Sequence, residues 1–160
     1  MTLTPLDFRE ALSRLASAVT IVATDGPAGK AGLTCSAVTS VSDQPATVLV
    51  CVKRTSRSNG VIKANKVFTV NALVAGQEPV ADVFAGRGGL EGAERFATGA
   101  WDRLLTGAPA LAGARMTLDC RLSELVEVGT HSVLFGQVEA VRLGDGGQPL
   151  VYADRRYHAI

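Results

Sequence analysis

The chain of 160 residues lacks the features that mark several large classes of protein. No apolar run reaches the roughly 20 residues of a membrane-spanning helix, and the opening MTLTPLDFREALSRLA has neither the basic start nor the apolar stretch of a secretory signal. Histidine occurs only twice, and the three cysteines, Cys35, Cys51 and Cys120, lack the spacing of metal ligands. We therefore expect a cytoplasmic protein with reduced thiols, no metal site and no membrane partner.

A strong excess of either charge is also missing. The formal net charge is +1, which gives no reason to expect nucleic acid as a partner. Hydrophobic residues make up 47% of the chain and charged residues 19%, so a disordered chain is excluded. The length suits one domain with its own core, and we assign residues 1–160 to a single domain.

The common nucleotide-binding and hydrolase motifs are absent as well. There is no G-x-x-x-x-G-K-[ST] loop and no G-x-S-x-G elbow. The glycine-rich run from Gly86 to Gly92 does not follow a predicted strand, and it misses the G-x-G-x-x-G spacing of dinucleotide-binding folds. Neither a carboxylate pair nor a Ser–His–Asp set can be assembled convincingly, so an enzyme of this sequence would leave the chemistry to a cofactor.

Hydrophobic periodicity predicts a mainly β protein with short helices. Thr4-Pro5 followed by Asp7 is typical of a helix start, and the helix that follows has an apolar face. Further helices are expected at 59–65 and 78–85, and strands at 18–24, 33–41, 47–52, 67–73, 116–128, 132–143 and 150–153. Most of these strands are joined by short turns, which favours antiparallel pairing and a small barrel over a parallel sheet.

The segment Gly32–Asn59 is the most informative part of the chain. Two apolar strand-like runs flank a turn at Pro45, and the second run opens into the hydroxyl-rich and basic loop KRTSRSN. Between Gln44 and Gln77 there are five cations and no acidic residue. Hydroxyls, backbone N–H groups and cations without carboxylates suit a phosphate or diphosphate. A solvated basic turn fits the composition equally well.

Two further places suit contact with a bound ring. His131 follows Gly129 and Thr130 at a predicted bend between two long strands, where it can donate to a ring or pack on it. The alternative there is an ordinary turn histidine. The C-terminal run Tyr152–His158 gathers two tyrosines, two arginines and a histidine, which suit a phosphate and a flat ring. The alternative there is a solvated tail.

Taken in order, four segments make the chain resemble the short-chain flavin reductase family, closest to the reductase component of 4-hydroxyphenylacetate 3-monooxygenase and its relatives. The segments are GLTCSAVTSVSDQPATVLVCVKRTSRSN, VFTVNAL, VGTHSVLFGQVEAV and GQPLVYADRRYH. The resemblance implies an FMN-binding split β-barrel of antiparallel Greek-key type that forms a homodimer. It also implies that NADH or NADPH reduces FAD or FMN, and that the reduced flavin diffuses to a separate monooxygenase component.

The resemblance also implies where the cofactors bind. Flavin contacts are expected on the first matching strand and its continuation, at Thr34, Cys35, Ser36, Ala37, Ser40, Val41 and Ser42. The next strand end and the phosphate loop are matched by Cys51, Val52, Lys53, Thr55, Ser56, Arg57, Ser58 and Asn59. His131 matches the histidine on the nicotinamide side and is the one residue assigned to catalysis. The pyridine-nucleotide segment at the C-terminus is matched by Arg155, Arg156, Tyr157 and His158.

Other functions on the same fold stay open at this point. Some relatives pass electrons from bound flavin to a corrinoid, cob(II)yrinic acid diamide, and others support pyrimidine catabolism. A non-catalytic flavin-binding protein is a further alternative from a different class. Such a protein needs no nicotinamide site, so His131 and the DRRYH run favour an enzyme.

Overall fold

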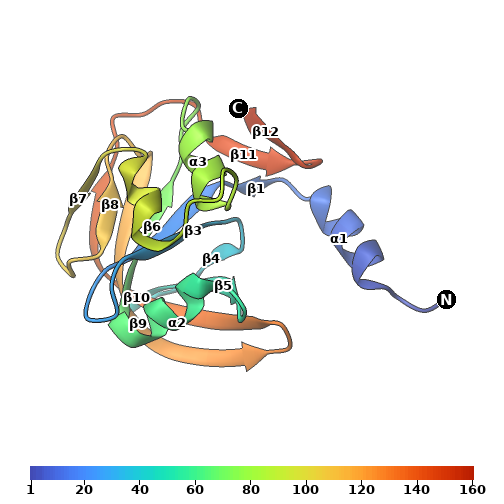
Figure 1. The fold of residues 1–160 in the computed structure, drawn as a ribbon, viewed down its shortest axis with the longest axis horizontal. Coiled ribbons are helices and arrows are strands. Elements are labelled where there is room, and N and C mark those ends of the chain that lie inside the picture. The colour runs from blue at the N-terminus through green and yellow to red at the C-terminus, as the bar shows by residue number, and fades with distance from the viewer.

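Antiparallel strands dominate residues 1–160, all of which the computed structural model describes (Figure 1). The helices are α1 (Pro5–Ser13), α2 (Arg57–Asn65), α3 (Glu78–Phe84) and the 3-10 helix η1 (Gly92–Ala97). The strands are β1 (Ser17–Ala18), β2 (Thr20–Thr24), β3 (Ala31–Cys35), β4 (Val38–Asp43), β5 (Ala46–Lys53), β6 (Val67–Ala72), β7 (Trp101–Arg103), β8 (Pro109–Leu111), β9 (Met116–Val128), β10 (His131–Leu143), β11 (Leu150–Ala153) and β12 (Arg156–Ala159). None of the helices has the length and apolar character that a membrane crossing requires.

A seven-stranded sheet in the order β3-β2-β6-β9-β10-β5-β4 forms the body of the molecule. Its spine is the long β9–β10 hairpin, in which Val128 and His131 are the last pair before the turn. The edge strands β3 and β4 are not hydrogen-bonded to each other, so the sheet is antiparallel but not closed. The strands β1, β11 and β12 form a separate small sheet, and β7 and β8 form another.

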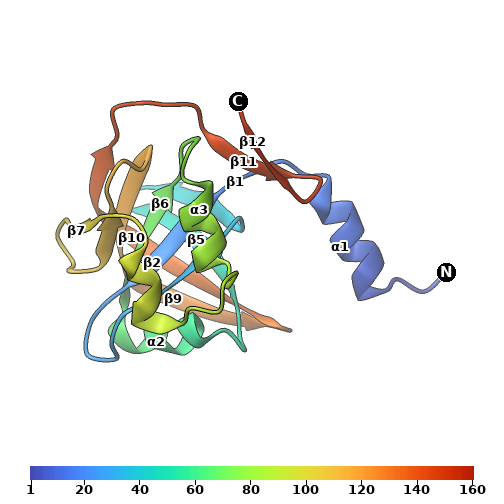
Figure 2. The same ribbon diagram turned by 45° about the horizontal axis from the view of Figure 1, so that its top comes forward.

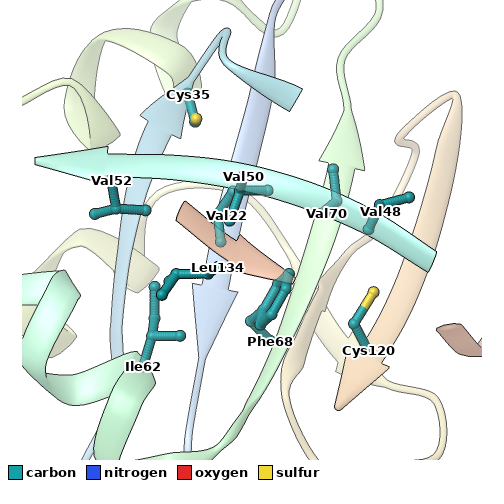
Figure 3. Close-up of a cluster of buried hydrophobic side chains, with 10 residues drawn as sticks. All are labelled: Val22, Cys35, Val48, Val50, Val52, Ile62, Phe68, Val70, Cys120 and Leu134. Atoms are coloured by element: carbon teal, nitrogen blue, oxygen red, sulfur yellow. The ribbon is translucent and has the colours of Figure 1, made fainter. Parts of the chain in front are cut away.

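The main core lies between parts of this curved sheet that cross one another. Figure 3 shows β5 passing across β2 and β6, with side chains from all three strands meeting between them. Residues of β5 alternate, so Val48, Val50 and Val52 point inward while the residues between them face outward. Phe68 of β6 and Ile62 of α2 are fully buried in the same cluster. Burying a side chain of this kind contributes roughly 1.5–3 kcal/mol.

A second apolar cluster holds α3, η1 and the β7–β8 pair against the sheet. Its buried Phe84 lies 5.0 Å from Phe96 and 5.2 Å from Trp101, measured between ring centroids, and these two rings pack against the cluster. Val19 and Ile21 of the β1–β2 region contribute the aliphatic side of this cluster. The region from α3 to η1 is thereby fixed beside β3, which borders the candidate site.

The chain bends at two points where the sequence predicts uninterrupted strands. Residues 33–41 are not one strand, because Ser36 and Ala37 carry the chain from β3 at one edge of the sheet to β4 at the other. Residues 18–24 are likewise divided at Val19, whose N–H donates to Leu150 O while its carbonyl accepts from Leu73 N–H. Apolar periodicity does not report such changes of partner strand, because both halves remain extended.

Three strands, β7, β8 and β12, were missing from the prediction. β12 continues the C-terminal hairpin after a turn in which Asp154 and Arg155 both have positive φ, the geometry of tight hairpin turns. β7 and β8 have only three residues each, which is too short for a periodic pattern. The Asp119 carboxylate fixes the loop between them by accepting from the N–H groups of Leu105 and Thr106 at 2.8 Å each.

Candidate functional site

The predicted ring-binding segments meet where β3 ends and β5 approaches its end. The Cys51 N–H donates to Ala37 O at 3.0 Å, and the Cys35 thiol lies 3.6 Å from Cys51 O. Burial raises the pKa of the Cys35 thiol to about 11, so the thiol is uncharged and contributes to packing. Ser36 and Ala37 are exposed beside it, and Ser40, Val41 and Ser42 follow on the exposed edge strand β4.

A cavity of about 220 Å³ opens next to Ser36, between β3 and the C-terminal hairpin. Its walls include Thr34, Arg87, Tyr152 and Tyr157, with the two tyrosine rings 5.3 Å apart. Residues predicted to contact flavin and a residue predicted to contact the pyridine nucleotide therefore line one space. Most of its lining is apolar, and Arg87 supplies one cation near the opening.

Asp82 of α3 holds the two polar groups on one side of this cavity. Its carboxylate accepts from the Tyr157 hydroxyl at 2.8 Å and from the Arg87 guanidinium at 2.7 Å. Burial, reinforced by the hydrogen bond to Asp82, raises the pKa of Tyr157 to about 12. The Tyr157 ring is therefore a neutral, oriented wall of the cavity.

The predicted phosphate loop follows β5 and leads into α2. Arg54 and Lys63 are both committed to Glu127, at 3.2 and 2.6 Å. Lys53 has no ion pair, and Arg57 has only a 3.9 Å contact with Glu91 in which both side chains are about 70% exposed. Arg57 and Lys53 are therefore the cations of this loop that are available to an anion.

The start of α2 adds unpaired donors to the same loop. Ser56 is the N-cap residue, and its side chain makes no capping hydrogen bond. The N–H groups of the first helical turn thus have no side-chain cap, and helix N-termini attract anions. Thr55 is exposed beside it and adds a hydroxyl.

Three of the predicted loop residues turn their side chains inward. Val52 and Ser58 are buried, and the buried Asn59 amide donates to Val52 O at 3.2 Å and to Ser132 Oγ at 2.9 Å. These side chains fix the loop against β10. Any contact they make with a ligand is through their backbone atoms.

His131 lies beside the predicted phosphate loop because β5 and β10 are paired. It is the cross-strand partner of Lys53, and the Arg54 N–H donates to Thr130 O at 2.9 Å. The Arg54 guanidinium also donates to Gly129 O at 3.3 Å. The His131 Nδ1 atom lies 2.8 Å from the Thr130 hydroxyl, while its exposed Nε2 atom has no partner within the chain.

The remaining C-terminal residues are spread over the β11–β12 hairpin. Arg155 forms an ion pair with Glu10 of α1 at 2.8 Å, and its hydrogen bond lowers the pKa of Glu10. The His158 Nε2 atom lies 3.1 Å from Ala153 O, and Arg156 is exposed. In Figure 1 this hairpin lies above β4 and β5, and the tip of the β9–β10 hairpin lies below them, whereas Figure 2 shows the C-terminal hairpin beside α1.

The loop from Gly86 to Gly92 borders the site, although sequence reasoning set it aside as a failed dinucleotide motif. Arg95 anchors it by donating to Leu90 O and to Gly32 O, both at 2.9 Å. Gly92 has a φ of +54°, and a Cβ there would lie 3.2 Å from the Arg57 guanidinium carbon. The glycine thus leaves room for Arg57, and the cluster of glycines was the sequence feature that marked this close approach.

The chain is similar in sequence to a known protein family and to its members. Residues 12–160 match the family model described as flavin reductase like domain. The chain is 50% identical over 153 residues to "FMN reductase (NADH) RutF" of Ancylobacter novellus, covering 96% of this chain and 83% of that protein.

Solved structures agree with that match. The NADH:FAD oxidoreductase SgcE6 of Streptomyces globisporus, in complex with NAD and FAD fragments, superimposes with a TM-score of 0.89 at 28% identity, covering 100% of this chain and 96% of that one. The styrene monooxygenase flavin reductase SMOB of Pseudomonas putida gives 0.83 at 26% identity, covering 96% and 97%.

Proposed function

The chain belongs to the family of flavin reductase like domains, and from this membership we propose that it is an NADH-dependent flavin reductase acting on FMN or FAD. The observation that carries the proposal is the 50% sequence identity, over 96% of this chain, to a protein named FMN reductase (NADH). When both are bound, the dihydronicotinamide gives a hydride to the flavin ring, and the chain needs to supply only binding and orientation.

The phosphate end of the flavin is assigned to the loop after β5. Arg57 and Lys53 are its two uncommitted cations, and they lie beside the uncapped start of α2. Cations, hydroxyls and helix N–H groups bind phosphate together, since each favours the anion independently. Thr55 and Ser56 supply the hydroxyls.

The ring is assigned to the exposed surface between the end of β3 and the edge of β4. Because β4 pairs only with β5, its outer backbone groups are unpaired along Ser40–Ser42. Such N–H groups can stabilise the negative charge that develops on a reduced ring. The cavity beside Ser36 continues this surface toward Tyr157.

The pyridine nucleotide is assigned to His131 and to the C-terminal hairpin. His131 presents a free Nε2 atom next to Lys53, and Tyr157 presents an oriented phenol wall. Both can position a nucleotide without taking part in proton transfer, since hydride transfer requires no protein acid or base.

We also propose finer features of the assembly that the resemblance implies. The facing edges β3 and β4 support a split barrel, and the absence of a disulfide supports a cytoplasmic protein. No residue of α1 is buried, and Leu6, Phe8 and Leu12 are each more than half exposed, which supports a homodimer that covers this helix. Similarity to SMOB, the flavin reductase of a styrene monooxygenase, supports release of reduced flavin to a monooxygenase component.

An anaerobic absorbance assay tests the proposed function. NADH is added to the protein with either FMN or FAD, and bleaching of the flavin band is followed. We expect rapid bleaching with at least one flavin and faster reaction with NADH than with NADPH. A yellow preparation that binds flavin tightly but never bleaches would instead identify a flavin-binding protein without reductase activity.

A further inference from the structure

Glu127 is the only acidic side chain in contact with the basic loop and α2 from the side of the β9–β10 hairpin. Its carboxylate lies 2.6 Å from Lys63 Nζ, 3.2 Å from Arg54 Nε and 2.8 Å from the Ser132 hydroxyl. Ser132 in turn accepts from the buried Asn59 amide at 2.9 Å. One carboxylate therefore ties together the loop after β5, helix α2 and both strands of the hairpin.

These contacts control the turn that precedes His131. Arg54 bonds to that turn twice, through its N–H to Thr130 O and through its guanidinium to Gly129 O. The Glu127 carboxylate contacts the same guanidinium at its Nε atom. Glu127 therefore helps to hold the turn before His131 through the Arg54 guanidinium, while the His131 backbone itself is paired with Lys53 and Val128 in the sheet.

The same contacts decide which cations face the phosphate. Arg54 and Lys63 are two of the five cations between Gln44 and Gln77, and both form ion pairs with Glu127. Lys53 has no ion pair, and Arg57 has only the 3.9 Å contact with Glu91. Glu127 thus lowers the positive potential near the loop and confines it to the two cations assigned to the flavin phosphate.

We propose that Glu127 is a positioning residue that couples the two halves of the site, holding the His131 turn at the pyridine nucleotide and withholding Arg54 and Lys63 from the flavin phosphate. This inference rests on the proposed flavin reductase activity. The proposal gives a role to a residue that contacts neither cofactor. Removing Glu127 should affect the binding of NADH and the binding of flavin in opposite directions. Loss of the carboxylate loosens the His131 turn, whereas it frees two cations beside the phosphate loop.

The test is Glu127→Gln, which keeps the shape and one hydrogen-bond acceptor while removing the charge. We expect the KM for NADH to rise about 5- to 10-fold with kcat changed less than about 2-fold. Flavin affinity, measured separately by fluorescence quenching, should be unchanged or a few-fold tighter, with a steeper dependence on salt. Ser132→Ala, which breaks the link to Asn59 without changing charge, should raise the KM for NADH by a smaller factor.

Glu139→Gln is the matched control. Glu139 forms an ion pair with Arg121 at 2.7 Å across the same two strands but away from the turn, so its loss should leave both affinities unchanged. An unchanged KM for NADH in Glu127→Gln would overturn the inference. So would a parallel weakening of NADH and flavin together with a lower Tm, because that is what a merely structural residue gives. Wild-type protein that fails to bleach flavin would refute the proposed function itself, which is measured first.

Discussion

Lys53 and His131 are cross-strand partners at the last rung of the β5–β10 ladder. Their backbones are fixed relative to each other by the sheet, and the next residue, Arg54, continues the contact into the turn before His131. A cation assigned to the flavin phosphate and a histidine assigned to the nicotinamide nucleotide therefore share one rigid platform. Placing both on paired strands holds them more precisely than two independent loops could.

Arg57→Ala should weaken flavin binding about 10-fold, because Arg57 is a poorly paired cation beside the uncapped start of α2. The Kd for FMN should also become less sensitive to salt. Flavin fluorescence quenching at two ionic strengths measures both effects. Arg103→Ala removes another exposed arginine, whose partner is Asp25, and it should leave the Kd unchanged. Equal affinities in the two variants would mean that the loop is merely solvated.

His131→Ala should raise the KM for NADH more than it weakens flavin binding, by about 5-fold against less than 2-fold. The reason is that the His131 ring is exposed and unpaired at Nε2, whereas the loop that we assign to the flavin phosphate is built from other residues. Steady-state kinetics and a flavin titration separate the two parameters. Lost flavin affinity with an unchanged KM would place the histidine on the flavin side instead.

The free energy of unfolding should fall as the pH rises above about 9. Burial raises the pKa of the Cys35 thiol to about 11 and that of Cys120 to about 12, whereas both ionise near 9.0 when unfolded. The unfolded chain therefore loses these protons first, so stability is complete below pH 9 and declines toward pH 11–12. The slope is about 1.4 kcal/mol per pH unit for each thiol.

Urea unfolding under reducing conditions at pH 8 and at pH 10.5 measures this slope. Cys120→Ala should be less sensitive to alkaline pH than the wild type because one of the two buried thiols is gone. A stability that does not change between these pH values would contradict the assignment.

Gly136→Ala and Gly60→Ala should change stability in opposite directions. A Cβ at Gly136 would lie 2.5 Å from Phe68 Cζ and 2.9 Å from Cys120 Cβ, so overpacking should cost about 1–3 kcal/mol. Gly60 lies inside α2 with nothing within 4 Å of such a Cβ, so alanine should stabilise the helix by about 0.5–1 kcal/mol. Thermal unfolding of both variants beside the wild type provides the comparison.

Local structure was predictable wherever it depends on neighbouring residues. Thr4 and Asp7 form the expected capping box, with Thr4 Oγ1 accepting from Asp7 N–H at 3.1 Å. The two long strands of the hairpin were visible as extended apolar patterns. The division of 33–41 into β3 and β4 was not visible, because only distant partner strands distinguish the two halves.

The candidate site was likewise predictable only where it depends on residues that are neighbours in the sequence. The acid-free stretch between Gln44 and Gln77 was evident from composition, and it contains the loop with Arg57. The composition did not reveal that Arg54 and Lys63 form ion pairs with Glu127, because Glu127 lies far along the chain on β9. The cluster of glycines from Gly86 to Gly92 was visible in the sequence, but the identity of its neighbour Arg57 was not, because only the fold brings the two segments together.

The sequence by itself determined the residue types at the site, the order of the strands along the chain and the family to which the chain belongs. The tertiary structure decided which of those residues face one another. Pairing of β5 with β10 placed His131 beside Lys53, and packing of the C-terminal hairpin placed Tyr157 beside Ser36. Contacts of this kind depend on how distant strands pair and pack, and a linear pattern of side chains carries no direct record of that choice.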